Sequence, residues 1–103
     1  MKKLQFTKTD INVEWLNQEH WLRGAISADY DFIAKVLPEK SEFGMGGSRV
    51  VSFVLWNSRD KEAGALPVAE YYGNWTIQPE DETAAELVRL IVSRLEEEQE
   101  NSE

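Results

Sequence analysis

The sequence contains no cysteine and a single histidine, His20. The absence of cysteine excludes disulfide bonds, thiolate zinc sites and cysteine nucleophiles. No further metal ligands lie near His20 at a suitable spacing, and no nucleophile-elbow motif accompanies it. We therefore expect no bound metal, no cofactor and no catalytic residue, and a non-enzymatic protein. A Ser/His/Asp triad assembled in space remains open, because triads are not recognisable from spacing alone.

Long hydrophobic runs are also missing. The longest apolar run spans residues 53–56, whereas a membrane-spanning helix needs about 20 such residues. The absence of cysteine fits a reducing compartment. We expect a cytoplasmic protein that does not contact a membrane.

Clusters of basic residues are absent as well. The formal net charge is −8 and is unevenly distributed. Residues 1–77 hold nine basic and ten acidic side chains, whereas residues 78–103 hold two basic and nine acidic ones. Nucleic-acid binding needs clustered Lys and Arg against the phosphates. The pattern disfavours direct nucleic-acid binding and places the acidity at the C-terminal end.

What the sequence does have is alternation of apolar and polar residues, the period of a half-buried strand. The alternating or apolar segments span residues 11–15, 22–28, 32–36, 50–56 and 67–72, with a continuation at 75–77. The segment 50–56 is apolar on both faces, which indicates a central strand. The fold class predicted is α+β: an antiparallel sheet of about five strands packed against one C-terminal helix.

The C-terminal segment changes to a helical period. Apolar residues recur on one helix face at Ala84, Leu87, Val88, Ile91 and Leu95. Thr83 followed by Glu86 matches a capping box. The acidic residues 96–98 oppose the helix macrodipole, so the helix is expected to fray there. We predict one domain over residues 1–98 and a disordered acidic tail over 99–103.

A glycine-rich stretch, residues 41–49, is predicted to be a loop in which Gly44 or Gly47 has a positive φ. A phosphate-binding loop would feed a helix and carry a Gly-Lys-Ser/Thr motif. Here the glycines precede a strand and no such motif follows. A tight connection is therefore the favoured interpretation, and a ligand-binding or catalytic loop is the alternative.

Three groups of residues form the predicted partner-binding surface. Aromatic side chains can fill a core or anchor a protein interface. An acidic helix end is either solvated or a negative surface that competes for a partner's basic site. The candidates are Glu42, Phe43 and Arg49 in the loop, Tyr71 and Trp75 among the aromatics, and Glu96, Glu97 and Glu98 at the acidic end.

Several residues together carry a family resemblance. They are Trp21-x-x-Gly24, Phe32-x-Ala34-Lys35-Val36, Glu39-x-Ser41-Glu42-Phe43-Gly44-Met45, Arg49-Val50-x-Ser52, Tyr71-x-x-x-Trp75 and Pro79. This string resembles a family of small uncharacterised proteins of bacteria and their phages, the DUF7678-like domains of unknown function. The family more often has Asp-Arg-Gly before the tryptophan, where this chain has Tyr72-Gly73-Asn74. The resemblance implies a phage or mobile-element origin and supplies no mechanism.

Three functions follow as hypotheses. The first is a small acidic interaction protein with a protein partner, in its sharper form an inhibitor of a host defence or nucleic-acid enzyme. The second is a ligand-binding domain or enzyme that uses the loop at residues 41–49. The third is a structural homo-oligomer, such as a homodimer, with a self-complementary apolar patch.

Overall fold

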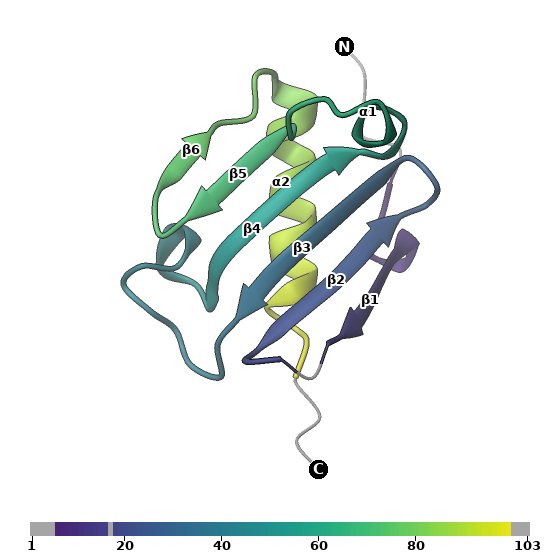
Figure 1. Ribbon diagram of the computed structural model, residues 1–103. Coiled ribbons are helices and arrows are strands. Elements are labelled where there is room, and N and C mark those ends of the chain that lie inside the picture. Colours follow the sequence, from purple (N-terminus) through teal and green to yellow (C-terminus); the bar gives the residue numbers. More distant parts are fainter. Residues whose placement is uncertain (1–5, 17, 100–103) are drawn as a thin grey trace.

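A computed structural model describes residues 6–16 and 18–99 as an antiparallel sheet with one long helix on one face (Figure 1). The sheet order follows the chain, from β1 to β6. The α+β class is confirmed, with six strands where about five were expected. The elements are η1 (Lys8–Asp10), β1 (Ile11–Trp15), β2 (Trp21–Ile26), β3 (Tyr30–Val36), η2 (Met45–Gly47), β4 (Val50–Asn57), α1 (Ser58–Glu62), β5 (Ala69–Tyr72), β6 (Trp75–Ile77) and α2 (Glu82–Leu95).

The sixth strand arises because the segment predicted as one strand with a continuation folds back on itself. Gly73 has φ +76°, a left-handed conformation that suits glycine, and it turns the chain between β5 and β6. Tyr71 then pairs with Trp75 in antiparallel register. The predicted break at residues 73 and 74 is therefore a hairpin turn.

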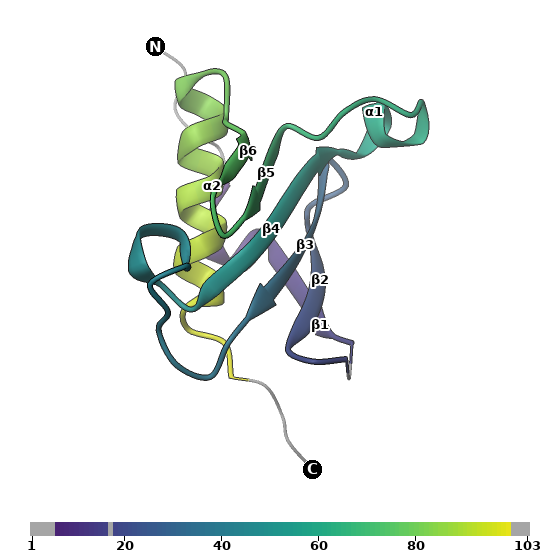
Figure 2. The ribbon, with the colours of Figure 1, turned by 60° about the vertical axis from the view of Figure 1, so that its left-hand side comes forward.

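One face of the sheet packs against α2, which Figure 2 shows lying on one side of the strands. Alternate residues point to this face, so that Leu22, Ala34 and Phe53 form one row across β2, β3 and β4. The helix contributes four of the five apolar residues predicted on one helix face, each at most 4% exposed: Leu87, Val88, Ile91 and Leu95. Burying a side chain of this kind stabilises a protein by about 1.5–3 kcal/mol.

Gly24 has a structural reason to be glycine. The ring of Phe32, its cross-strand partner, lies where a side chain on Gly24 would stand. A Cβ there would be 2.4 Å from Phe32 Cζ and 2.5 Å from the carbonyl oxygen of Asn12. Because Gly24 has no side chain, the large ring of Phe32 can pack against the backbone where β1, β2 and β3 lie side by side.

The glycine-rich loop uses its glycines in two ways. Gly47 has φ +77°, as predicted for Gly44 or Gly47. Gly44 has an ordinary φ of −73°. It is instead packed so closely that a Cβ would lie 1.8 Å from the carbonyl oxygen of Ser48. The loop therefore folds onto its own backbone, and η2 forms within it.

The N-cap of helix α2 lies two residues before the first residue of the predicted capping box, Thr83. Asp81 is the N-cap, and its side chain accepts a hydrogen bond of 2.8 Å from the backbone N–H of Ala84. The prediction that Thr83 and Glu86 cap the helix is wrong, because Thr83 is already in the first turn. The helix ends at Leu95, and of the predicted tail over 99–103 only Gln99 lies within the described residues.

The helix α1 lies in the stretch between two of the predicted strand segments, 50–56 and 67–72. Asn57 caps it by accepting hydrogen bonds from the backbone N–H groups of Arg59 and Asp60. It stands on the side of the sheet away from α2 (Figure 2). The face without α2 is thus bordered by a short helix.

We expect Ile91→Ala to lower the free energy of unfolding by about 2–5 kcal/mol, because it leaves a cavity under a fully buried side chain. Ser93→Ala, at an exposed position of the same helix, should change it by less than about 0.5 kcal/mol. Urea denaturation of the two variants and wild type measures the difference. Equal midpoints for Ile91→Ala and wild type would contradict the packing of α2 on the sheet.

Candidate partner-binding site

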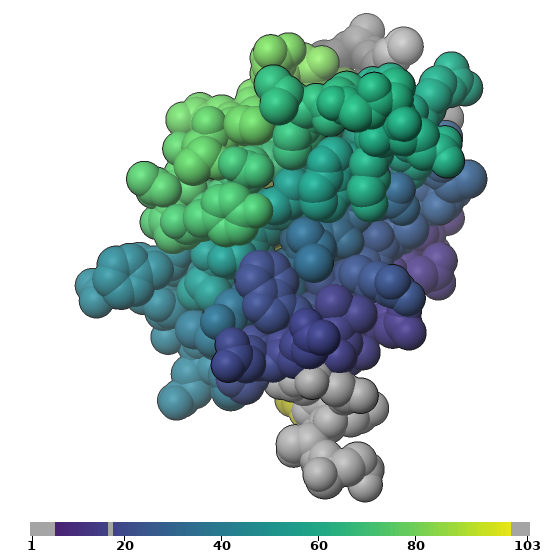
Figure 3. Space-filling view, viewed as in Figure 1, coloured from purple at the N-terminus to yellow at the C-terminus, as the bar shows by residue number. Residues whose placement is uncertain are grey.

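Figure 3 shows the molecule from the face of the sheet without α2, where polar and apolar side chains lie beside one another. Arg23, Ile33, Val54 and Glu70 form one row across β2 to β5. Val54 is only 2% exposed although it lies outside the main core. Nearby, the Lys61 ammonium of α1 lies 4.6 Å from the centre of the Trp56 ring. This face is partly covered by its own side chains and by α1.

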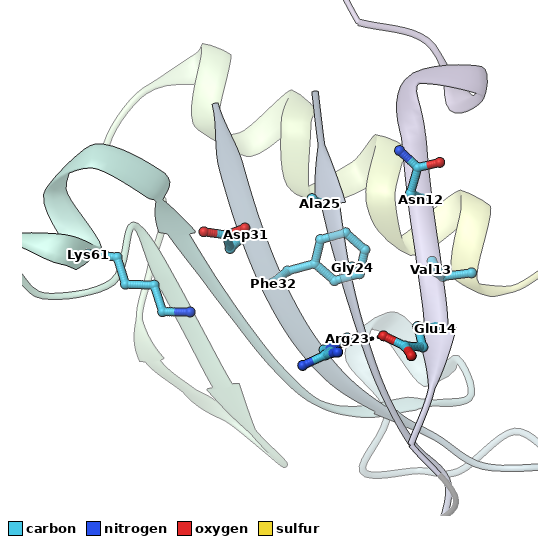
Figure 4. Close-up of a pocket in the computed structure, with 9 residues that line it drawn as sticks. All are labelled: Asn12, Val13, Glu14, Arg23, Gly24, Ala25, Asp31, Phe32 and Lys61. Atoms are coloured by element: carbon cyan, nitrogen blue, oxygen red, sulfur yellow. Dashed lines mark hydrogen bonds and ion pairs between the residues drawn. The ribbon is translucent and has the colours of Figure 1, made fainter. Parts of the chain in front are cut away.

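A shallow hollow of about 420 Å³ lies on this face (Figure 4). Glu14 and Arg23 form an ion pair of 2.8 Å at its rim, and Asp31 and Lys61 also line it. Two acids and two bases leave no net charge. The hollow therefore has no electrostatic preference for an anion or a cation.

Another depression, of about 630 Å³, lies between the edge strand β6 and helix α2, and η2 closes one end. We call it the β6–α2 groove. Much of its lining is apolar: Met45, Trp75, Pro79, Ala85, Val88 and Val92. Arg89 is exposed and lines it too, and it makes no ion pair within residues 6–16 and 18–99. An apolar groove with one cation is suited to a ligand that combines apolar groups with one negative charge.

One of the predicted residues, Trp75, lines this groove, and it is linked through Tyr71 to Phe43. The rings of Tyr71 and Trp75 are 5.2 Å apart, edge to face. The Tyr71 hydroxyl donates a hydrogen bond of 2.8 Å to the carbonyl oxygen of Phe43. Trp75 is 37% exposed and lines the groove, whereas Tyr71 is buried behind it. Phe43 and Glu42 are exposed in the adjoining loop.

Arg49 lies elsewhere and has a structural task. Its guanidinium donates hydrogen bonds to the carbonyl oxygens of Leu95, Glu96 and Glu98, at 3.1, 3.1 and 2.6 Å. The helix ends at Leu95, whose carbonyl also accepts from the backbone N–H of Glu98, so Arg49 binds the last helical carbonyl and two carbonyls of the segment that follows. Arg49 was predicted to bind a partner. In the structure its guanidinium is already engaged by carbonyl groups of this chain.

The three glutamates of the acidic end pair with basic side chains of this chain. Glu96 lies 3.5 Å from Arg49 Nε and also accepts from the Arg49 backbone N–H. Glu97 pairs with Lys8, and Glu98 with Arg94. The hydrogen bond and charge of Lys8 lower the pKa of Glu97. The helix itself ends at Leu95, before these residues, and the three pairs tie the segment that follows it to the fold.

Sequence reasoning missed Met45, Ala85, Arg89 and Val92 as groove residues. A signal was present in α2, where Ala85, Arg89 and Val92 recur at helical spacing beside the core stripe. The contribution of Met45 depends on how the loop folds, which residue spacing does not report.

A family model described as a domain of unknown function, DUF7678, matches residues 20–96. The chain belongs to this family. No curated protein and no solved structure matches the chain. The part of this DUF7678 protein that the family model matches contains β2 to β6 and the whole of α2, while β1 lies before it. The β6–α2 groove therefore lies entirely within the family domain.

Among residues 6–16 and 18–99, no group of three His, Cys, Asp or Glu side chains is placed to hold a metal ion. No helix in the same part of the chain is long and apolar enough to cross a membrane.

We expect Arg49→Met to lower the free energy of unfolding by about 1.5–3 kcal/mol, because it removes charged hydrogen bonds to the end of α2 while keeping an apolar stem. Arg59→Met, at an exposed position in α1, is the control and should change it by less than about 0.5 kcal/mol. Urea denaturation followed by far-UV circular dichroism measures both. A loss no larger for Arg49→Met than for Arg59→Met would show that the cap contributes little.

Proposed function

We propose that this protein is a non-enzymatic interaction protein whose β6–α2 groove holds a short apolar segment of a protein partner. The observation that carries the proposal is the groove itself. A large aromatic side chain, Trp75, remains 37% exposed beside an apolar groove of about 630 Å³. Tryptophan and arginine are enriched among the residues that dominate binding energy at interfaces.

The acidic end supports the proposal less well. Glu96, Glu97 and Glu98 are each paired with a basic side chain of the same chain. A partner's basic site would have to displace those pairs before it gained from the carboxylates. The groove requires no such exchange, because Arg89 has no ion pair within the described residues.

An inhibitor of a host defence or nucleic-acid enzyme, encoded by a phage or another mobile element, is the sharper form of this proposal. The family resemblance supports the origin, and the lack of cysteine supports action in the cytoplasm. In this form the groove would bind an apolar segment of the host enzyme and compete with that segment's own partner.

The homo-oligomer is the second candidate, and the face without α2 favours it. Ile33 and Val54 lie between Arg23 and Glu70 in one cross-strand row, so two copies could place opposite charges together. The helix α1 stands on that same side and would hold two flat sheets apart (Figure 2). The ligand-binding loop has less support, because the backbone of Ser48 occupies the space beside Gly44.

The proposal is tested by selecting binders from a library of random twelve-residue peptides. We expect wild type to enrich peptides that share apolar residues, and Ala85→Gln to abolish their binding by filling the groove. Glu86→Gln, the neighbouring exposed position outside the groove, should bind them as wild type does. Fluorescence polarisation with a labelled enriched peptide gives the affinities.

Two results would contradict groove binding. One is the absence of any enriched peptide. The other is an enriched set that binds Ala85→Gln as well as wild type but loses binding to Trp56→Ser, on the face without α2. A single dimeric species in sedimentation, lost in Ile33→Glu, would support the homo-oligomer instead.

A further inference from the structure

The edge of β6 is the feature that extends the proposed function. In the sheet order β6 comes last and pairs only with β5, so within the described residues its other edge has no strand beside it. An exposed edge offers unpaired backbone N–H and C=O groups to another chain. Proteins use such edges to bind extended peptides, which add a strand to the sheet.

The groove lies where the side chains of an added strand would point. Side chains alternate between the two faces of a sheet. Trp75 is paired with Tyr71, whose side chain is in the core between the sheet and α2, so Trp75 is on the helix side. Every second side chain of a segment beside β6 would therefore face α2 and meet Met45, Val88 and Val92 in the groove.

Arg89 adds a charge requirement. It is the one charged residue lining the groove among the described residues, and it lies on the helix wall opposite β6. The protein as a whole carries a net charge of −8, which repels a segment rich in acidic residues. One carboxylate placed at Arg89 gains a local pair while adding little to that repulsion.

We infer that the partner segment binds as an extended seventh strand along β6, with alternate apolar side chains in the groove and one carboxylate at Arg89. This inference rests on the proposed function. The carboxylate belongs either to an Asp or Glu side chain or to the C-terminus of the segment. Both sources present the same group to the guanidinium.

The test of strand addition uses the most enriched twelve-residue peptide and two sets of backbone N-methylated analogues. An added strand directs its N–H groups alternately toward β6 and away from it. We expect methylation at alternate residues in one set to weaken binding at least tenfold, and methylation at the intervening residues to leave it nearly unchanged. Equal affinities for both sets would overturn strand addition.

The test of the carboxylate uses the same peptide in amidated form and with its acidic residue changed to the amide. Arg89→Glu should weaken the parent peptide about three- to tenfold, a range set by exposed ion pairs and added repulsion. The analogue without the responsible carboxylate should lose this sensitivity, and whichever analogue does so identifies the source. The same loss with all analogues would overturn the pairing at Arg89.

These outcomes distinguish a failure of strand addition from a failure of groove binding. If Ala85→Gln abolishes binding while both N-methylated sets bind equally, the groove binds a segment that is not a strand. If Ala85→Gln binds normally, the groove itself is not the site and the proposed function fails. Hydrogen exchange of the β6 amides gives an independent readout, since strand addition should slow exchange at Trp75, Thr76 or Ile77 and leave β2 unchanged.

Discussion

The hydrogen bonds from Arg49 tie the end of α2, already packed on the sheet through Leu87, Val88, Ile91 and Leu95, to the start of β4. A helix ends with unpaired carbonyl groups and a partial negative charge, and here three acidic residues follow Leu95. Without a nearby positive charge, these carboxylates would destabilise the end of the helix. The Arg49 guanidinium supplies donors to three carbonyls and sits beside the Glu96 carboxylate. Because Arg49 directly precedes β4, a central strand, this one side chain joins the helix end to the middle of the sheet.

The same connection positions the groove. The loop that contains η2 ends at Arg49, which is held by α2. Earlier in the loop, the carbonyl of Phe43 accepts a hydrogen bond from Tyr71 of β5. Met45 lies between these two attachments, so its place at the end of the groove is set by both the sheet and the helix. In the proposed binding mode, these two attachments would hold the loop in place and so lower the cost of ordering it when a segment binds.

The sequence predicts the parts of this fold that have a local period. Alternation identifies the strands, and helical spacing identifies the residues of α2 that are buried, including Ile91 at 0% exposed. It cannot reveal that Arg49 caps α2 or that Lys8 pairs with Glu97, because those partners are far apart in the chain. The groove depends on a hairpin, a folded loop and a helix face at once. Its aromatic residue, Trp75, was found by composition, whereas Arg89 was not, because the spacing of Ala85, Arg89 and Val92 places them on one helix face but does not say what that face meets.

In the proposed strand addition, the short length of β6 would make the open edge selective. A long exposed edge would pair with any extended chain and promote aggregation. Here the edge strand spans only Trp75–Ile77, and its register with β5 shifts between Glu70 and Tyr71. So few backbone hydrogen bonds, each contributing about 0.5–1.5 kcal/mol net, cannot offset the entropy of ordering a free segment. Binding must therefore draw on the groove as well. A segment without apolar side chains at alternate positions would gain only the few backbone hydrogen bonds with β6. A highly acidic segment would also be repelled by the net negative charge of the protein. Under this proposal the edge would discriminate between segments because its few backbone hydrogen bonds do not suffice for binding without the groove.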